Sequence, residues 1–276
     1  MTNGGDMKIK IIIKIIFIMI AIFSSLIFSS FAEAKEPLRY SSSAQVLAAV
    51  GEDLLKTFEE DSGIGINLFV GSSDAAVHRM MHGAADIAST AESINYSRMD
   101  YGYTEIVFAK APLIIITNVS TTVKELTVKQ LQDIFSGSIS NWKEVGGPDK
   151  QIIVVIPDRN TAAYRNFTML ALKRYDIKYD YLAYRSTDVV SLVKHMPWSI
   201  SFISKGEHTS GDPVKKIAID GRKAEDKDYP FFQEFYFVTK GEPKGASKLL
   251  IDFFFSEKAK SALKKSGLIP PTGVTW

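Results

Sequence analysis

Apolar positions along the chain follow two alternating periods, which predicts helices interleaved with strands. Val46, Val50, Leu54 and Phe58 recur every four residues, as on one face of a helix that ends at Gly63. The runs IGINLFV and IIVVI are instead rich in β-branched residues, which is typical of buried strands. This alternation indicates an α/β fold with mainly parallel sheets flanked by helices.

The remaining segments follow the same two patterns. Strands are predicted at Ala85–Thr90, Thr104–Lys110, Pro112–Asn118 and Trp198–Ser204, and from Gln233 onward. Helices are predicted from Ser72 to Gly83, at Lys124–Phe135, Thr161–Arg174 and Asp188–His195, and once or twice within Ala246–Lys265. No internal repeat interrupts this order.

The N-terminal segment has a different composition from the rest. Lys8, Lys10 and Lys14 lead into the apolar run IIFIMIAIFSSLIFSSF, and small residues at Ala32 and Ala34 follow. This order predicts a secretory signal peptide, residues 1–34, that is cleaved after Ala34. Because the apolar run is long, an uncleaved membrane anchor is the alternative.

Composition narrows the class of protein further. The chain has no cysteine, which excludes a lipid-anchoring cysteine after the signal, disulfides and thiolate metal sites. The formal net charge is +2, so nothing favours binding to nucleic acid. We therefore expect a soluble protein of the periplasm that is not a lipoprotein.

Hydroxyl side chains gather at three places where a predicted strand passes into a helix. These places are Ser41–Ser43, Ser72–Ser73 and Asn160–Thr161. A helix N-terminus offers free backbone N–H groups and a positive dipole end, so several that converge would bind an oxyanion. Alternatively, each hydroxyl simply caps its own helix.

One stretch carries a resemblance to a known family. Residues 133–148 read DIFSGSISNWKEVGGP, and the segments MPWSISFISKG and YPFFQEFYFVTKGEPKG follow later. These segments resemble the periplasmic phosphate-binding proteins of phosphate ABC importers, and the resemblance spans nearly all of the chain after the signal. It implies a two-lobed periplasmic binding protein of type II, each lobe a mainly parallel sheet flanked by helices.

The resemblance also implies a set of ligand residues. By their match to the family's ligand loops, these are Ser42, Ser43, Ser72, Ser73, Thr90, Arg159, Asn160 and Thr161. Three departures fall on the same loops. Asn160–Ala163 replaces a glycine-rich SGT segment, Ala91 stands beside Glu92 where the family has a charged ligand residue, and Asp74 replaces a small residue.

The implied organisation divides the chain after the signal into two lobes. Residues 35–116 and 233–276 form the first lobe, and residues 117–232 form the second. The protein would capture a small oxyanion, most readily phosphate, in the cleft between the lobes. It would deliver the ligand as a monomer to the membrane subunits of an ABC transporter, without a cofactor and without catalysis.

Two other functions stay open at this point. The departures at the ligand loops motivate a sensory or partner-binding module of the same fold that no longer binds phosphate. A secreted phosphatase would need an activated nucleophile, for which Ser73 near His78 is the one candidate. His78 and His82 have the spacing of metal ligands, but the sequence offers no third ligand, so no metal site is predicted.

Overall fold

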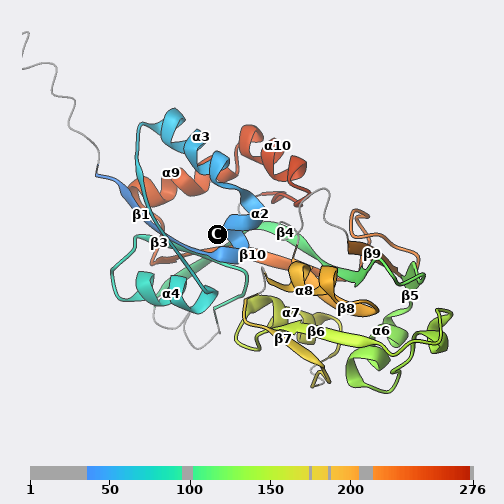
Figure 1. Ribbon diagram of the computed structural model, residues 1–276. Coiled ribbons are helices and arrows are strands. Elements are labelled where there is room, and N and C mark those ends of the chain that lie inside the picture. The colour runs from blue at the N-terminus through green and yellow to red at the C-terminus, as the bar shows by residue number, and fades with distance from the viewer. Residues whose placement is uncertain (1–35, 95–101, 174–175, 186–187, 205–213, 274–276) are drawn as a thin grey trace, which may run out of the picture. The chain divides into compact units, whose positions relative to one another are not determined.

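A computed structural model describes residues 36–94, 102–173, 176–185, 188–204 and 214–273 (Figure 1). The predicted signal peptide, residues 1–34, lies outside these ranges. The strands are β1 (Leu38–Ser43), β2 (Ile66–Gly71), β3 (Ile87–Thr90), β4 (Tyr103–Asn118), β5 (Glu125–Leu126), β6 (Ile153–Pro157), β7 (Tyr181–Ala183), β8 (Ser199–Ser204), β9 (Val214–Ile219) and β10 (Phe232–Lys240). The helices are α2 (Ala44–Val50), α3 (Glu52–Ser62), α4 (Ser73–Met81), α6 (Val128–Ser136), the 3-10 helix η1 (Trp142–Val145), α7 (Ala162–Leu170), α8 (Val189–His195), α9 (Gly245–Phe254) and α10 (Glu257–Lys265).

The strands form one mixed sheet in the order β2-β1-β3-β10-β4-β8-β6-β7, with β9 also paired to β4 and β5 paired to β9. The pairs β1–β2, β1–β3, β6–β7, β6–β8 and β5–β9 are parallel. The long strands β4 and β10 pair antiparallel to each other and to their other neighbours. The predicted α/β class is confirmed, and the two antiparallel strands lie between two parallel halves.

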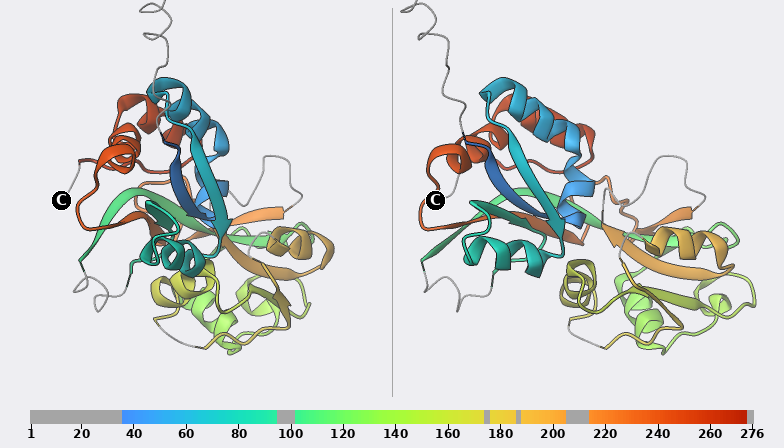
Figure 2. Two further views of the ribbon diagram at one scale, coloured as in Figure 1. Left: turned by 90° about the vertical axis from the view of Figure 1, so that its left-hand side faces the viewer. Right: turned by 60° about the vertical axis from the view of Figure 1, so that its left-hand side comes forward.

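Strand β4 is shared by both halves of the sheet. Its residues Tyr103–Pro112 pair with β10, whereas Leu113–Asn118 pair with β8 and β9. The apolar cores change over at the same point, because Ala111 packs with the core of α2, α3, α9 and α10, and Leu113 packs with the core of α6, α7 and α8. Helix α4 has its own small core on the other face of β3 and β10. Figure 2 shows α4 across the sheet from α3 and α9.

The structure corrects several predicted boundaries. The helix predicted from Val46 to Phe58 is two helices, because Gly51 has φ 83° and interrupts the hydrogen-bond ladder. The two strands predicted at Thr104–Lys110 and Pro112–Asn118 are one strand, β4. Pro112 has no N–H, and β4 accommodates it where its pairing passes from β10 to β8. The sequence patterns did not predict the short strands β5, β7 and β9.

No helix in the described ranges is both long enough and apolar enough to cross a lipid bilayer.

Candidate functional site

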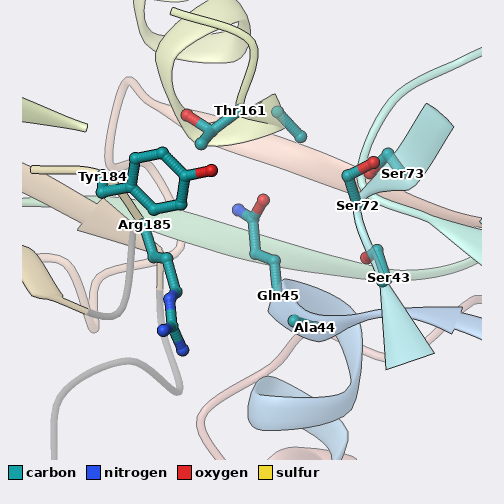
Figure 3. A pocket seen from close by; sticks show the side chains of 10 residues that line it. Ser43, Ala44, Gln45, Ser72, Ser73, Thr161, Tyr184 and Arg185 are labelled. Atoms are coloured by element: carbon teal, nitrogen blue, oxygen red, sulfur yellow. The ribbon is translucent and has the colours of Figure 1, made fainter. Parts of the chain in front are cut away.

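A pocket of about 320 Å³ lies where three of the predicted hydroxyl segments meet (Figure 3). Its walls come from four connections: β1 to α2, β2 to α4, β6 to α7, and the segment after β7. The lining residues are Ser43, Ala44, Gln45, Gly71, Ser72, Ser73, Thr161, Ala162, Tyr184 and Arg185. The structure thus brings together Ser43, Ser72, Ser73 and Thr161 from the predicted ligand set.

Ser43 occupies the junction of β1 and α2. Its backbone is extended, and its Oγ accepts a hydrogen bond from the N–H of Val46 at 3.2 Å, which caps the helix. Ser41 and Ser42, which were predicted to share this capping role, instead lie within β1. A single residue of the serine run therefore begins the helix, and it is the one that faces the pocket.

The second wall is the start of α4. The Oγ of Ser72 accepts a hydrogen bond from the N–H of Ala75 at 3.1 Å, and Ser73 Oγ accepts one from the N–H of Ala91 at 3.3 Å. The second bond ties the helix to the end of β3. Gly71 precedes both serines, and a Cβ there would come within 2.9 Å of the Phe69 ring, so a small residue keeps this turn close-packed.

The third wall is the start of α7. Thr161 caps this helix, because its hydroxyl donates to the carbonyl of Asp158 at 2.7 Å and accepts from the N–H of Tyr164 at 3.3 Å. Asn160 is exposed, and its N–H donates to the Asp158 side chain at 2.8 Å. Asn160 therefore shapes the turn but does not line the pocket.

The electrostatics of the pocket favour a negative ligand. The N-termini of α4 and α7 both border it, and their first-turn N–H groups beyond the capped ones have no acceptor within the helix. Arg185 supplies a formal positive charge, and none of the described lining residues carries a carboxylate. Tyr184 is 81% exposed at the mouth of the pocket. The arrangement can hold a small oxyanion by backbone and hydroxyl donors.

Three other predicted ligand residues lie outside the lining. Ser42 is buried and shares a hydrogen bond of 2.8 Å with Ser89 Oγ. Thr90 is also buried, and its Oγ1 accepts from the N–H of Glu92 at 3.1 Å. Arg159 is exposed, with its guanidinium carbon 5.6 Å from the centre of the Tyr179 ring.

Among the lining residues that the sequence patterns missed, three have polar side chains, which are Gln45, Tyr184 and Arg185. Gln45 lies two residues after Ser43, so its position beside a predicted helix start was an available signal. Tyr184 and Arg185 follow β7, which is three residues long with two of them exposed, and such a strand has no hydrophobic period to mark it. A contribution from this segment could not be predicted without the fold.

An ion-pair cluster borders the pocket on the side of α4 and α7. Arg165 Nε donates to both carboxylate oxygens of Glu92 at 2.8 Å, and its terminal nitrogen lies 3.4 Å from Asp74. Asp74, which stands where the resembling family has a small residue, therefore has a cationic partner.

Burial and ion pairing act in opposite directions on the pKa values of Glu92 and Arg165. Burial raises the pKa of Glu92 above its usual 4.5, and the neighbouring Asp74 adds to the rise, against the lowering effect of Arg165. Burial also lowers the pKa of Arg165, but its two acidic partners outweigh that and raise it overall. Glu92 is the more buried partner, with 20% of its side chain exposed against 33% for Arg165, so burial has the larger effect on the pKa of the carboxyl.

The described residues offer no metal centre. The rings of His78, on α4, and His82, directly after it, lie 4.2 Å apart. No third ligand joins them in the described ranges, where no group of three His, Cys, Asp or Glu side chains could hold an ion. The pocket residues also include no histidine that could act as a base.

Comparisons with known proteins identify the relatives of this chain. Residues 32–258 match the family model described as the PBP superfamily domain. The phosphate-binding protein PstS of Bacillus subtilis (strain 168) is 28% identical over 230 residues, which cover 79% of this chain and 75% of that protein. A structure from Clostridium perfringens, described as a phosphate ABC transporter substrate-binding protein with bound phosphate, has a TM-score of 0.76 at 26% identity and covers 86% of this chain and 100% of its own. An ABC-type phosphate transport receptor from Vibrio cholerae has a TM-score of 0.69 at 25% identity and covers 85% of this chain and 100% of its own.

Proposed function

The chain belongs to the PBP superfamily, and we propose that it is a solute-binding protein that captures inorganic phosphate for an ABC importer. The observation that carries the proposal is the pocket between the N-termini of α4 and α7. It is lined by hydroxyls and one cation, and no carboxylate among the described residues faces it. Helix N-termini of this kind bind phosphate groups through backbone N–H donors and the helix dipole.

The proposed ligand contacts come from the lining. Ser43, Ser72, Ser73 and Thr161 would surround the oxyanion at the helix starts, and Arg185 would supply charge from the fourth wall. The remaining members of the predicted set, which are Ser42, Thr90, Arg159 and Asn160, stay predictions. Their contribution would require a bound form with different side-chain positions.

The pocket lies between the two proposed lobes. Residues 35–116 with 233–276 would form one lobe, and residues 117–232 the other. The division of β4 between two cores at Ala111 and Leu113 supports this, and so does the packing of Phe231 and Phe235 in different cores. Movement of one lobe against the other would then open and close the pocket around its ligand.

The proposed setting follows from the same family. A signal peptide, residues 1–34, would export the protein to the periplasm, where cleavage after Ala34 would release it. The loaded protein would dock as a monomer on the membrane subunits of the importer. It would bind its ligand without catalysis and without nucleic acid.

Calorimetry tests the proposal directly. Titration of the purified protein with inorganic phosphate at neutral pH is expected to give a saturable heat with one site per chain. The absence of heat at roughly millimolar phosphate would overturn the proposal. A Kd of about 1 mM corresponds to only about 4 kcal/mol of binding free energy, so weaker binding would not support capture of phosphate. That result would instead favour the sensory module of the same fold.

A further inference from the structure

A second cavity lies where β4 passes from one apolar core to the other. Its volume is about 630 Å³, against about 320 Å³ for the pocket at the starts of α4 and α7, and the described residues that line the two do not overlap. Sites for small molecules usually measure roughly 300 to 1,000 Å³. We call it the hinge cavity, because Pro112 of β4 and Phe232 of β10 form part of its wall.

The wall of the hinge cavity combines residues of both cores. Ile114 and Ala224 belong to the core of α6, α7 and α8, and Phe232 packs against that core. Leu268 belongs to the core of α2, α3, α9 and α10. A molecule in the cavity would therefore contact both halves of the fold.

Backbone hydrogen bonds hold β4 on each side of this change between cores. Lys110 and Ile269 exchange two of them, at 2.8 and 2.9 Å, which attaches the C-terminal segment to β4. Three residues after Lys110, the N–H of Leu113 donates to the carbonyl of Phe231 at 2.9 Å. The frame of the cavity is thus made of paired backbone, so the apolar wall is built into the fold.

The charges that border the hinge cavity are unbalanced. Lys227 and Lys264 line it, and neither has an ion pair or a side-chain hydrogen bond within the described part of the chain. Glu225 is the acidic residue among the described lining residues, and Lys216 pairs with it at 2.9 Å. The other lining residues are apolar or glycine. An apolar wall bordered by two unpaired ammonium groups is complementary to an anion that carries an apolar chain.

We propose that the hinge cavity is a second ligand site, which takes a small carboxylate with an aliphatic chain and whose occupancy raises the affinity of the first pocket for its oxyanion. Burial of the chain against the apolar wall favours binding. The ammonium groups of Lys227 and Lys264 supply charge-assisted hydrogen bonds to the carboxylate. A cation of the same length would meet two like charges.

The coupling follows from the position of the cavity. The hinge cavity is present in the same conformation that brings Ser72 and Thr161 to one pocket. A ligand that contacts both cores binds this arrangement better than one in which the cores have moved apart. It therefore raises the affinity for the oxyanion, and the oxyanion raises its affinity by the same factor. This coupling rests on the proposed oxyanion function, whereas binding at the hinge cavity does not.

Calorimetry with octanoate tests the site. We expect a Kd on the order of 1 mM or tighter, and binding of acetate and of octylammonium at least about tenfold weaker, because each lacks one half of the recognised chemistry. Lys227→Gln/Lys264→Gln should weaken octanoate binding at least about tenfold. Lys265→Gln is the matched control, since Lys265 shares the last turn of α10 with Lys264 but does not line the cavity, and it should change the affinity less than about twofold.

Equal binding of octanoate and octylammonium by the wild-type protein would overturn the site without any variant. Unchanged octanoate affinity in the double variant, shown to be folded by urea unfolding, would overturn it as well. A phosphate titration with saturating octanoate measures the coupling, and the Kd for phosphate is expected to fall about fivefold in the wild-type protein and to stay unchanged in the double variant. An unchanged Kd in the wild-type protein would overturn the coupling. Binding of octanoate without any binding of phosphate would instead remove the proposed function and leave the hinge site standing.

Discussion

Arg165 on α7 holds Glu92, the second residue after β3, through a bond from its Nε to each carboxylate oxygen at 2.8 Å. The two residues are 73 positions apart in the chain. The same guanidinium donates to the carbonyl of Asn160 at 3.0 Å, within the turn that starts α7. The pair therefore links the α7 wall of the pocket to the end of β3. There the carbonyl of Ala91 also accepts a hydrogen bond from Asn166 on α7.

Removal of Arg165 is expected to destabilise the protein. In Arg165→Met the partly buried carboxylate of Glu92 loses its cation, and breaking such a pair leaves an uncompensated charge. Because both side chains keep some solvent contact, we expect a loss of about 2 kcal/mol in the free energy of unfolding at pH 7, less than for a fully buried pair. Urea unfolding of the wild-type protein and the variant measures this difference in the free energy of unfolding. The double variant Arg165→Met/Glu92→Leu should recover most of the loss, and a double variant as unstable as the single one would contradict this account.

The pH dependence of stability should report the burial of Glu92. Its folded-state pKa lies above the usual 4.5, so the folded protein holds this proton more tightly than the unfolded chain does. The resulting stabilisation is fully present below pH 4.5 and is lost as the pH rises through the raised pKa. The free energy of unfolding of the wild-type protein, relative to Glu92→Gln, should therefore increase on acidification from neutral pH. Parallel urea titrations of the two proteins measure this difference, and a decrease on acidification would show that ion pairing with Arg165 outweighs burial.

The sequence predicted the helix starts at the pocket better than the long-range contacts. Thr161 and Ser72 cap their helices as a hydroxyl after a strand is expected to do, because capping is a local interaction within three residues. Arg165 gave no such signal, since its acidic partners come from distant segments. Gln45 likewise bonds to Gln233, 188 positions away, which the fold alone brings beside it.

The two buried serines Ser73 and Ser42 provide a matched pair for the ligand contacts. Ser73 lines the pocket, and its Oγ accepts from the N–H of Ala91, which leaves its proton available to a ligand. Ser42 is equally buried but bonds to Ser89 behind the lining. We expect Ser73→Ala to weaken phosphate binding about tenfold, and Ser42→Ala to change the affinity much less. Calorimetry with phosphate measures the affinity of both variants. A larger loss of affinity in Ser42→Ala than in Ser73→Ala would indicate that Ser42 contacts the ligand directly.

A second matched pair distinguishes the two exposed arginines near the pocket. Arg185 lines it, whereas Arg159 lies over the Tyr179 ring outside the lining. A charge-assisted hydrogen bond to an oxyanion contributes roughly 1.5 to 3 kcal/mol, so Arg185→Gln should weaken phosphate binding at least about tenfold. Arg159→Gln should change it less than about threefold, because screening by salt weakens a charge that does not touch the ligand. Titrations of both variants at low and high salt measure these effects. If Arg159→Gln gave the larger loss, the loop at the start of α7 would have to reorganise on binding so that Arg159 reached the anion, as the family resemblance implied.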